Sequence, residues 1–229
     1  YGIDLDEEIG LLELIRAVHA VEGIERIRLG SLEPRIITEE FARSLSELPK
    51  VCPHFHLSLQ SGCDETLKRM NRRYNSEEYY EKCTLLRKYF QDPALTTDVI
   101  VGFPGETEEE FEASRAFVER VSFYETHIFK YSRREGTRAA VMKDQVPEQI
   151  KAKRSAVLIG LGHEKQNEYE RKYTGREVEV LIEETAEIGG KEVWIGHTKE
   201  YIKVAVSSEE NLQNRIVKGT AGKDLQIIH

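Results

Sequence analysis

The chain has few of the residues that would suit it to an extracellular or membrane setting. It contains only three cysteines among 229 residues, Cys52, Cys63 and Cys83, and they lie far apart. An odd number at wide spacings argues against a disulfide framework and fits a reducing compartment. No apolar run approaches the roughly eighteen residues of a membrane span, and no charged segment followed by an apolar one opens the chain. We therefore expect a cytoplasmic protein with no membrane segment.

Positive charge is also scarce. The 33 lysines and arginines are outnumbered by 41 aspartates and glutamates, which gives a formal net charge of −8. Such a chain has no global basic field to hold a nucleic acid, so any RNA contact must be local. Hydrophobic residues make up 39% of the sequence, enough for a buried core. The length allows one large domain, or one medium domain and a small one.

Apolar periodicity changes repeatedly between strand and helix through the first part of the chain. We predict strands at 24–29, 55–59, 95–101 and 124–131, and helices at 6–21, 38–48, from about 64, 76–89 and 108–120. Thr107 and Glu110 form a capping-box pattern, and Ser76 is the predicted cap of its helix. Residues 1–4 resemble a loop that leaves an earlier strand. Alternating strands and helices of these lengths predict a parallel sheet in an α/β domain.

The pattern changes after residue 171. Residues 147–171 form a charged helical stretch that we predict to be a connector. Short strands separated by Gly, Asn and Ser follow, at 177–183, 193–196, 201–206, 214–217 and 225–228. This pattern is typical of a small antiparallel barrel. We place the domain boundary near Lys172, with domains at 1–171 and 172–229.

Polar residues occur where the predicted parallel strands end. His54, His56, Ser58 and Gln60 alternate on one face of their strand, whereas a parallel strand buried on both faces should be nearly all apolar. A polar row predicts a water-filled or ligand-filled interior. Two histidines on one strand without a third ligand favour hydrogen-bonded packing over a metal site. Asp98 lies within an apolar strand, where its carboxylate needs a partner, and a ribose diol would suit it.

Two further features are weaker on their own. Ser31 follows a predicted strand and offers a hydroxyl, although serine at such a place is often only a turn residue. The basic side chains of Lys68, Arg69, Arg72 and Arg73 could bind a carboxylate or phosphate, or could form a solvated helix face. The glycines of GFPGET permit close approach to a ligand, but the segment matches neither the P-loop nor the dinucleotide-binding pattern.

Four segments carry a resemblance to a known family: RLGSLEPR, HFHLSLQSGCDETLKRMNRRY, TTDVIVGFPGETEEEF and FKYSRREGTRAAVMKDQV. Together they resemble the radical S-adenosylmethionine methylthiotransferases, and GHTKEYIKVAV resembles the C-terminal TRAM barrel of that family. The resemblance covers essentially the whole chain. It implies a partial radical-SAM (β/α)6 TIM-like barrel, followed by a small all-β, OB-like TRAM barrel.

The resemblance also implies a cofactor site and a reaction. Ser31 and Gln60 match polar contacts to the ribose or amine of S-adenosylmethionine, Arg72 matches the contact to its methionine carboxylate, Asp98 a ribose contact and Ile100 an adenine contact. The implied reaction adds a methylthio group to C2 of N6-threonylcarbamoyladenosine beside the tRNA anticodon. The family uses two 4Fe–4S clusters and an electron donor such as flavodoxin or ferredoxin.

The chain departs from the family at one point, because it contains no C-x-x-x-C-x-x-C motif. None of its cysteines has the spacing that ligation of the catalytic iron–sulfur cluster requires. We therefore expect the cluster ligands to lie upstream of this chain, and we expect the chain by itself to be inactive.

The predicted TRAM barrel gives a modest case for RNA binding. Lys199 and Lys203 could contact phosphates, and Tyr201 and Trp194 could stack on bases, although the aromatics could equally be barrel core. Other hypotheses remain open. They are action on isopentenyladenosine in tRNA or on a ribosomal protein, a cluster-less RNA-binding adaptor, and a metal-dependent barrel enzyme that uses His54, His56 and Asp98.

Overall fold

The computed structural model describes residues 10–223 and 227–228, and its chain divides into two compact units, Tyr1–Lys165 and Gln166–His229. The division falls inside a long helix, earlier in the chain than the boundary that composition predicts. The loop predicted at residues 1–4 lies outside the described residues. No helix among the described residues is long and apolar enough to span a membrane.

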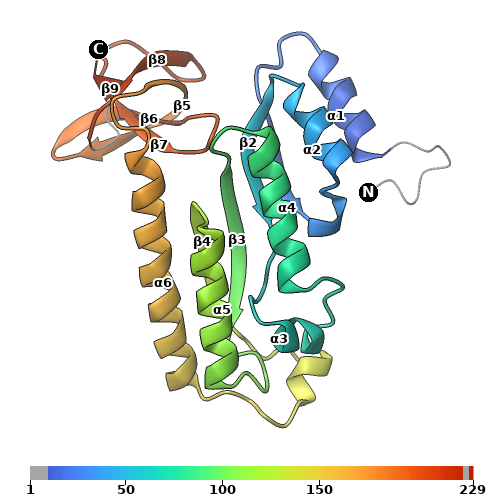
Figure 1. The fold of residues 1–229 in the computed structure, drawn as a ribbon. Coiled ribbons are helices and arrows are strands. Elements are labelled where there is room, and N and C mark those ends of the chain that lie inside the picture. Colours follow the sequence, from blue (N-terminus) through green and yellow to red (C-terminus); the bar gives the residue numbers. More distant parts are fainter. Residues whose placement is uncertain (1–9, 224–226, 229) are drawn as a thin grey trace. The chain divides into compact units, whose positions relative to one another are not determined.

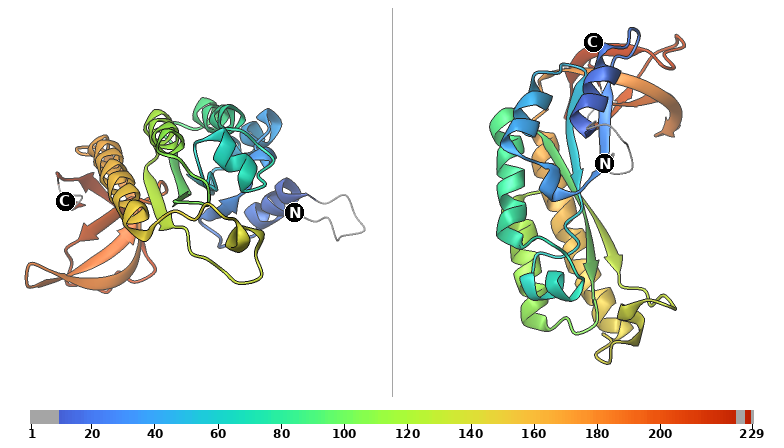
Figure 2. Two further views of the ribbon diagram at one scale, coloured as in Figure 1. Left: turned by 90° about the horizontal axis from the view of Figure 1, so that it is seen from below. Right: turned by 90° about the vertical axis from the view of Figure 1, so that its right-hand side faces the viewer.

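The first unit is built on a parallel sheet (Figure 1). Its strands, in the spatial order β1-β2-β3-β4, are β1 (Ile27–Leu32), β2 (Val51–Leu57), β3 (Ala94–Val101) and β4 (Glu125–Lys130). The helices are α1 (Leu11–Ala20), α2 (Glu39–Ser46), α3 (Asp64–Arg69), α4 (Ser76–Tyr89), α5 (Glu108–Val121) and α6 (Glu148–Arg171), with short 3-10 turns η1 (Pro34–Ile36) and η2 (Arg138–Val141). Helices α4 and α5 cover one face of the sheet (Figure 2). The predicted α/β class with a partial barrel is confirmed.

Local capping explains where several helices begin. Helix α5 starts at the predicted capping box, in which Thr107 accepts from the backbone of Glu110 and the Glu110 side chain accepts from that of Thr107. Helix α4 starts at Ser76, and its cap lies one residue earlier than predicted. Asn75, not Ser76, makes the reciprocal pair of capping hydrogen bonds with Glu78. An Asn side chain caps the backbone amide three residues later as well as a Ser side chain does.

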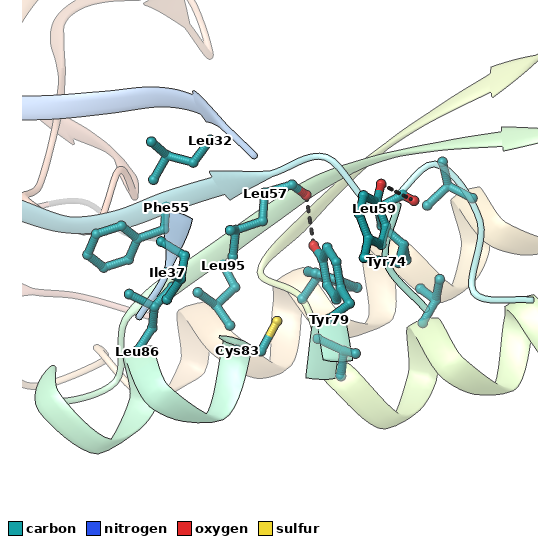
Figure 3. Packing of buried hydrophobic residues seen from close by; sticks show 14 of the residues in the cluster. Leu32, Ile37, Phe55, Leu57, Leu59, Tyr74, Tyr79, Cys83, Leu86 and Leu95 are labelled. Carbon is teal, nitrogen blue, oxygen red and sulfur yellow. Dashed lines mark hydrogen bonds between the residues drawn. The ribbon is translucent and has the colours of Figure 1, made fainter. Parts of the chain in front are cut away.

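The core lies between the sheet and helices α4 and α5 (Figure 3). Phe55, Leu57 and Leu95 point toward α4, where Tyr79 and Cys83 are fully buried. The Tyr79 hydroxyl donates to the Leu57 carbonyl at 2.7 Å, which satisfies a polar group that would otherwise be costly to bury. Burial raises the pKa of the Cys83 thiol to about 12. All three cysteines are free and buried.

The loop after β3 is held by a buried ion pair. The Glu106 carboxylate accepts from the Arg154 guanidinium at 2.7 Å and from the Gly102 amide at 2.8 Å, and both side chains are almost completely buried. Burial raises the pKa of Glu106, while the bonds from Gly102 and Arg154 oppose that rise. Gly102 has a φ of +70°, and an added Cβ would overlap the side chain of Lys151. This glycine therefore packs against α6, which corrects the expectation that it makes room for a ligand.

The second unit contains a five-stranded antiparallel sheet in the order β7-β6-β5-β8-β9. The strands are β5 (Glu177–Ile188), β6 (Lys191–His197), β7 (Lys203–Val206), β8 (Ile216–Ala221) and β9 (Ile227–Ile228). A small all-β domain is thus confirmed. One predicted strand began at Tyr201, but this residue has a φ of +70°, in the left-handed region, and cannot continue a strand.

Replacement of Arg154 by Met should destabilise the first unit by about 3–5 kcal/mol, because it leaves the Glu106 carboxylate buried without its cation. A buried carboxyl with a raised pKa contributes stability at low pH that is lost as the pH rises through that pKa. The destabilisation that Arg154→Met causes should therefore be larger at about pH 8 than at about pH 5. Urea unfolding of the wild type and the variant at both pH values measures it.

The matched control is Arg115→Met. Arg115 also bonds two glutamates, Glu112 and Glu119, but its pairs are exposed and should contribute less than about 1 kcal/mol. Equal, small effects of the two substitutions would contradict the role given to the buried pair.

Candidate functional site

The face of the sheet that points away from α4 and α5 carries polar side chains. Residues that alternate with the core members Phe55, Leu57 and Leu95 lie on this inner face. Parallel register places His56 beside Thr96, and Ser31 of β1 beside His56. Of the polar row that alternation predicts, His54 and His56 lie on β2, which ends at Leu57, and the row is extended by both neighbouring strands.

Three side chains meet at the centre of the inner face. His56 Nε2 lies 3.4 Å from Asp98 Oδ2, and the rings of His56 and His127 stack with centroids 5.7 Å apart. His127 pairs with Asp98 in the β3–β4 register. The other His56 nitrogen, Nδ1, lies 3.0 Å from the Thr96 hydroxyl. With Thr96 as the donor to Nδ1, the proton on Nε2 faces the carboxylate, so His56 orients Asp98.

Sequence reasoning missed His127. It lies within a predicted strand, and the signal that could have identified it is alternation, since residues 127 and 129 share a face. What the sequence did not give was the register that puts residue 127 opposite Asp98. The Asp98 side chain is 29% exposed and that of His56 13%, so the carboxylate remains open to a ligand.

Gln60 is locked against β3 by its backbone. Its amide donates to the Asp98 carbonyl at 2.8 Å, and its carbonyl accepts from the Ile100 amide at 2.9 Å. The residue has a φ of +69°, a conformation that costs energy for a side chain other than glycine. This backbone pairing brings together three of the five residues predicted to bind the cofactor: Gln60, Asp98 and Ile100.

The other two predicted residues are placed differently. Ser31 is exposed and belongs to β1 itself, which continues to Leu32, whereas the sequence placed it after the strand. Arg72 is exposed in the turn between α3 and α4, and its side chain makes no hydrogen bond or ion pair with any residue that the structure describes. The basic cluster is thus divided, because Arg69 instead forms a bidentate pair with Glu110 on α5 and lowers the pKa of that carboxyl.

The inner face fits S-adenosylmethionine better than it fits an iron–sulfur cluster. A partly exposed carboxylate beside a constrained polar residue suits a ribose diol. The cysteines do not fit a cluster, because Cys52 lies in β2, Cys63 caps α3 and Cys83 lies in α4, all of them buried. The set of His56, Asp98 and His127 also suits a divalent cation, since their ligand atoms lie within 4.8 Å of one another.

The residues predicted to contact RNA in the second unit lie around the β6–β7 connection. Tyr201 stacks on His197 with ring centroids 4.4 Å apart and an interplanar angle of 15°. Lys203 is exposed and pairs with His197 in the register. The Lys199 ammonium lies 4.0 Å from the Glu179 carboxylate, whose negative charge partly offsets the positive potential around the lysine.

Comparison with known proteins gives consistent results. The model of the radical SAM superfamily matches residues 2–118. A tRNA-2-methylthio-N(6)-dimethylallyladenosine synthase of Thermoanaerobacter sp. (strain X514) is 45% identical over 183 residues, 80% of this chain and 39% of that protein. The threonylcarbamoyladenosine tRNA methylthiotransferase MtaB of Bacillus subtilis (strain 168) is 41% identical over 220 residues, 95% of this chain and 49% of that protein. The chain therefore spans less than half the length of these relatives.

A solved structure supports the fold. Coproporphyrinogen III oxidase (HemN) from Escherichia coli, described as a radical SAM enzyme, superimposes with a TM-score of 0.53 and 20% sequence identity, over 68% of this chain and 36% of that one. At this identity the likeness concerns the fold alone. The family match and the methylthiotransferase relatives confirm the resemblance seen in the sequence, and the chain belongs to the radical SAM superfamily.

Proposed function

We propose that this chain is the cofactor-orienting and RNA-binding part of a tRNA methylthiotransferase. The observation that carries the proposal is the backbone pairing of Gln60 with Asp98 and Ile100, which brings a polar residue next to the strand that carries the open carboxylate of Asp98 and the side chain of Ile100 on its inner face. Such a set matches the amine, ribose and base of S-adenosylmethionine. The relatives named above support the reaction class.

In this proposal Asp98 accepts hydrogen bonds from the ribose hydroxyls, and His56 holds its carboxylate in place. Ile100 packs on the adenine, and Gln60 and Ser31 bind polar groups of the cofactor. Arg72 pairs with the methionine carboxylate, for which it is available because it has no ion-pair partner among the residues that the structure describes. When bound, the cofactor supplies the reactive group. No cysteine of this chain fits the cluster, so the proposal assigns cluster ligands and electron transfer from flavodoxin or ferredoxin to parts outside these residues.

Within the reaction class, we favour N6-threonylcarbamoyladenosine as the substrate. At equal coverage of this chain, 95%, MtaB of Bacillus subtilis is 41% identical, whereas the dimethylallyladenosine synthase of Acetivibrio thermocellus is 37% identical. The second unit then corresponds to the TRAM barrel, with the domain at 172–229 and cytoplasmic tRNA as its partner.

Replacement of Asp98 or Arg72 by Ala should weaken binding of S-adenosylmethionine to the chain at least about tenfold, because each removes a charge-assisted contact worth about 1.4 kcal/mol or more. Isothermal titration measures the affinity. Arg73→Ala is the control, since Arg73 is the exposed neighbour of Arg72. If the Asp98 and Arg72 variants both bind S-adenosylmethionine with wild-type affinity, the assignment of the cofactor site is wrong.

Charge reversal at Lys199 and Lys203 should weaken tRNA binding and flatten its dependence on salt, because fewer counterions are released from the RNA. Filter binding at several salt concentrations checks this. Lys191→Glu, a change in an exposed residue at the start of β6, serves as a control. Unchanged binding by the Lys199 and Lys203 variant would contradict an RNA-binding role for this part of the second unit.

A second candidate function, divalent-cation binding, is supported by the set of His56, Asp98 and His127. It predicts that the chain binds Zn²⁺ by itself, that His127→Ala abolishes binding, and that the exposed His163→Ala does not. Titration with ZnCl₂ decides the matter. Absence of zinc binding would eliminate this candidate, and competition between zinc and S-adenosylmethionine would show that both use Asp98.

A further inference from the structure

The segment after β4 carries a local excess of positive charge in an acidic protein. Four exposed cations, Arg133, Arg134, Arg138 and Lys143, hereafter the basic rim, are accompanied within residues 131–147 by two acids, Glu135 and Asp144. The segment thus has a net charge of +2, whereas the whole chain has −8.

The basic rim also differs from several arginines of the first unit, which are paired with glutamates. Ion pairs with glutamate hold the guanidinium groups of Arg69, Arg115, Arg120 and Arg154. By contrast, within the described part of the chain the four basic-rim residues form no ion pair, and their side chains donate no hydrogen bond to another residue. Their charge is therefore available to an external anion.

The segment is nevertheless well anchored. The Tyr131 amide donates to the Val101 carbonyl at 2.9 Å, and the Gly105 amide donates to the Asp144 carbonyl at 2.7 Å. Within the segment, the Gln145 side chain donates hydrogen bonds to the carbonyls of Ala139 and Met142. One end is thus fixed to the last residue of β3 and the other to the loop that follows it, so the cations are held at the carboxyl edge of the sheet with a reduced ordering cost on binding.

The anchored segment lies beside the candidate cofactor site. In the right-hand view of Figure 2, the yellow segment leaves the carboxyl end of β4 and projects to the side opposite α4 and α5. The inner face is on that side. On β4, Phe129 pairs with Ile100 in the register and follows His127 on the same face. Its ring is 53% exposed, although it is a large apolar group.

We propose that Phe129 and the basic rim form an RNA-contact surface of the first unit, in which the cations bind phosphates and the Phe129 ring stacks on a nucleobase. An exposed aromatic ring next to unpaired arginines is the combination that single-stranded RNA requires, since bases stack while phosphates pair with guanidinium groups. A loop nucleotide stacked on Phe129 lies next to Ile100 and hence next to the cofactor. This inference rests on the proposed function, because it takes RNA as the substrate.

The test measures binding of the whole chain to a transcribed anticodon stem–loop RNA by fluorescence anisotropy at several salt concentrations. Arg133→Glu with Arg134→Glu should weaken binding at least about tenfold and reduce the magnitude of the salt slope by about 1.4–1.8, because each of the two lost phosphate contacts removes about 0.7–0.9. Phe129→Ala should weaken binding about tenfold without changing the slope, and Phe129→Tyr should restore it.

Arg43→Glu with Lys82→Glu is the matched control, since it makes the same change in net charge on helices α2 and α4. Circular dichroism confirms that each variant is folded. If the wild type does not bind the stem–loop, the RNA part of the proposed function fails and the inference with it. If the wild type binds and both the Arg133/Arg134 and Phe129 variants match it in affinity and salt slope, the inference alone is overturned.

Discussion

The parallel register of β3 with the segments on both sides is the constraint on which the inner face depends. On one side, two backbone hydrogen bonds fix Gln60 between Asp98 and Ile100. On the other, the same strand sets His127 beside Asp98 and Phe129 beside Ile100. Because side chains alternate along a strand, a shift of one residue would turn the polar set into the core and the core leucines and valines outward. The burial of Val99 and Val101 therefore holds the site in register.

The features that the sequence predicts well are local. The capping box of Thr107 and Glu110 follows from spacing alone, and an aspartate within an apolar strand is recognisable from the sequence as a residue that needs a partner. The features that it misses depend on contacts between distant segments. His127 gains its place from strand pairing, and Gly102 from the approach of Lys151 on a helix far along the chain. Ser76 and Asn75 are both good caps, so only the geometry selects between them.

Charge pairing distinguishes several arginines of the first unit from those of the basic rim. Arg69, Arg120 and Arg154 are held by glutamates of other helices or loops. Those beyond β4 are exposed and have no carboxylate partner among the described residues. In an acidic protein that binds RNA, a local positive potential attracts the phosphates, while the negative potential of the remaining surface repels them. The RNA is therefore favoured in one orientation over others. The net charge of −8 and the basic rim are thus compatible.

The buried thiols have a practical consequence. All three cysteines are buried in the first unit, and burial raises the pKa of Cys83 to about 12, so little thiolate of Cys83 forms near neutral pH. A cysteine introduced at an exposed position would be the fastest-reacting thiol of the chain. Fluorophores and spin labels could then be attached at one chosen position while the native cysteines remain in place.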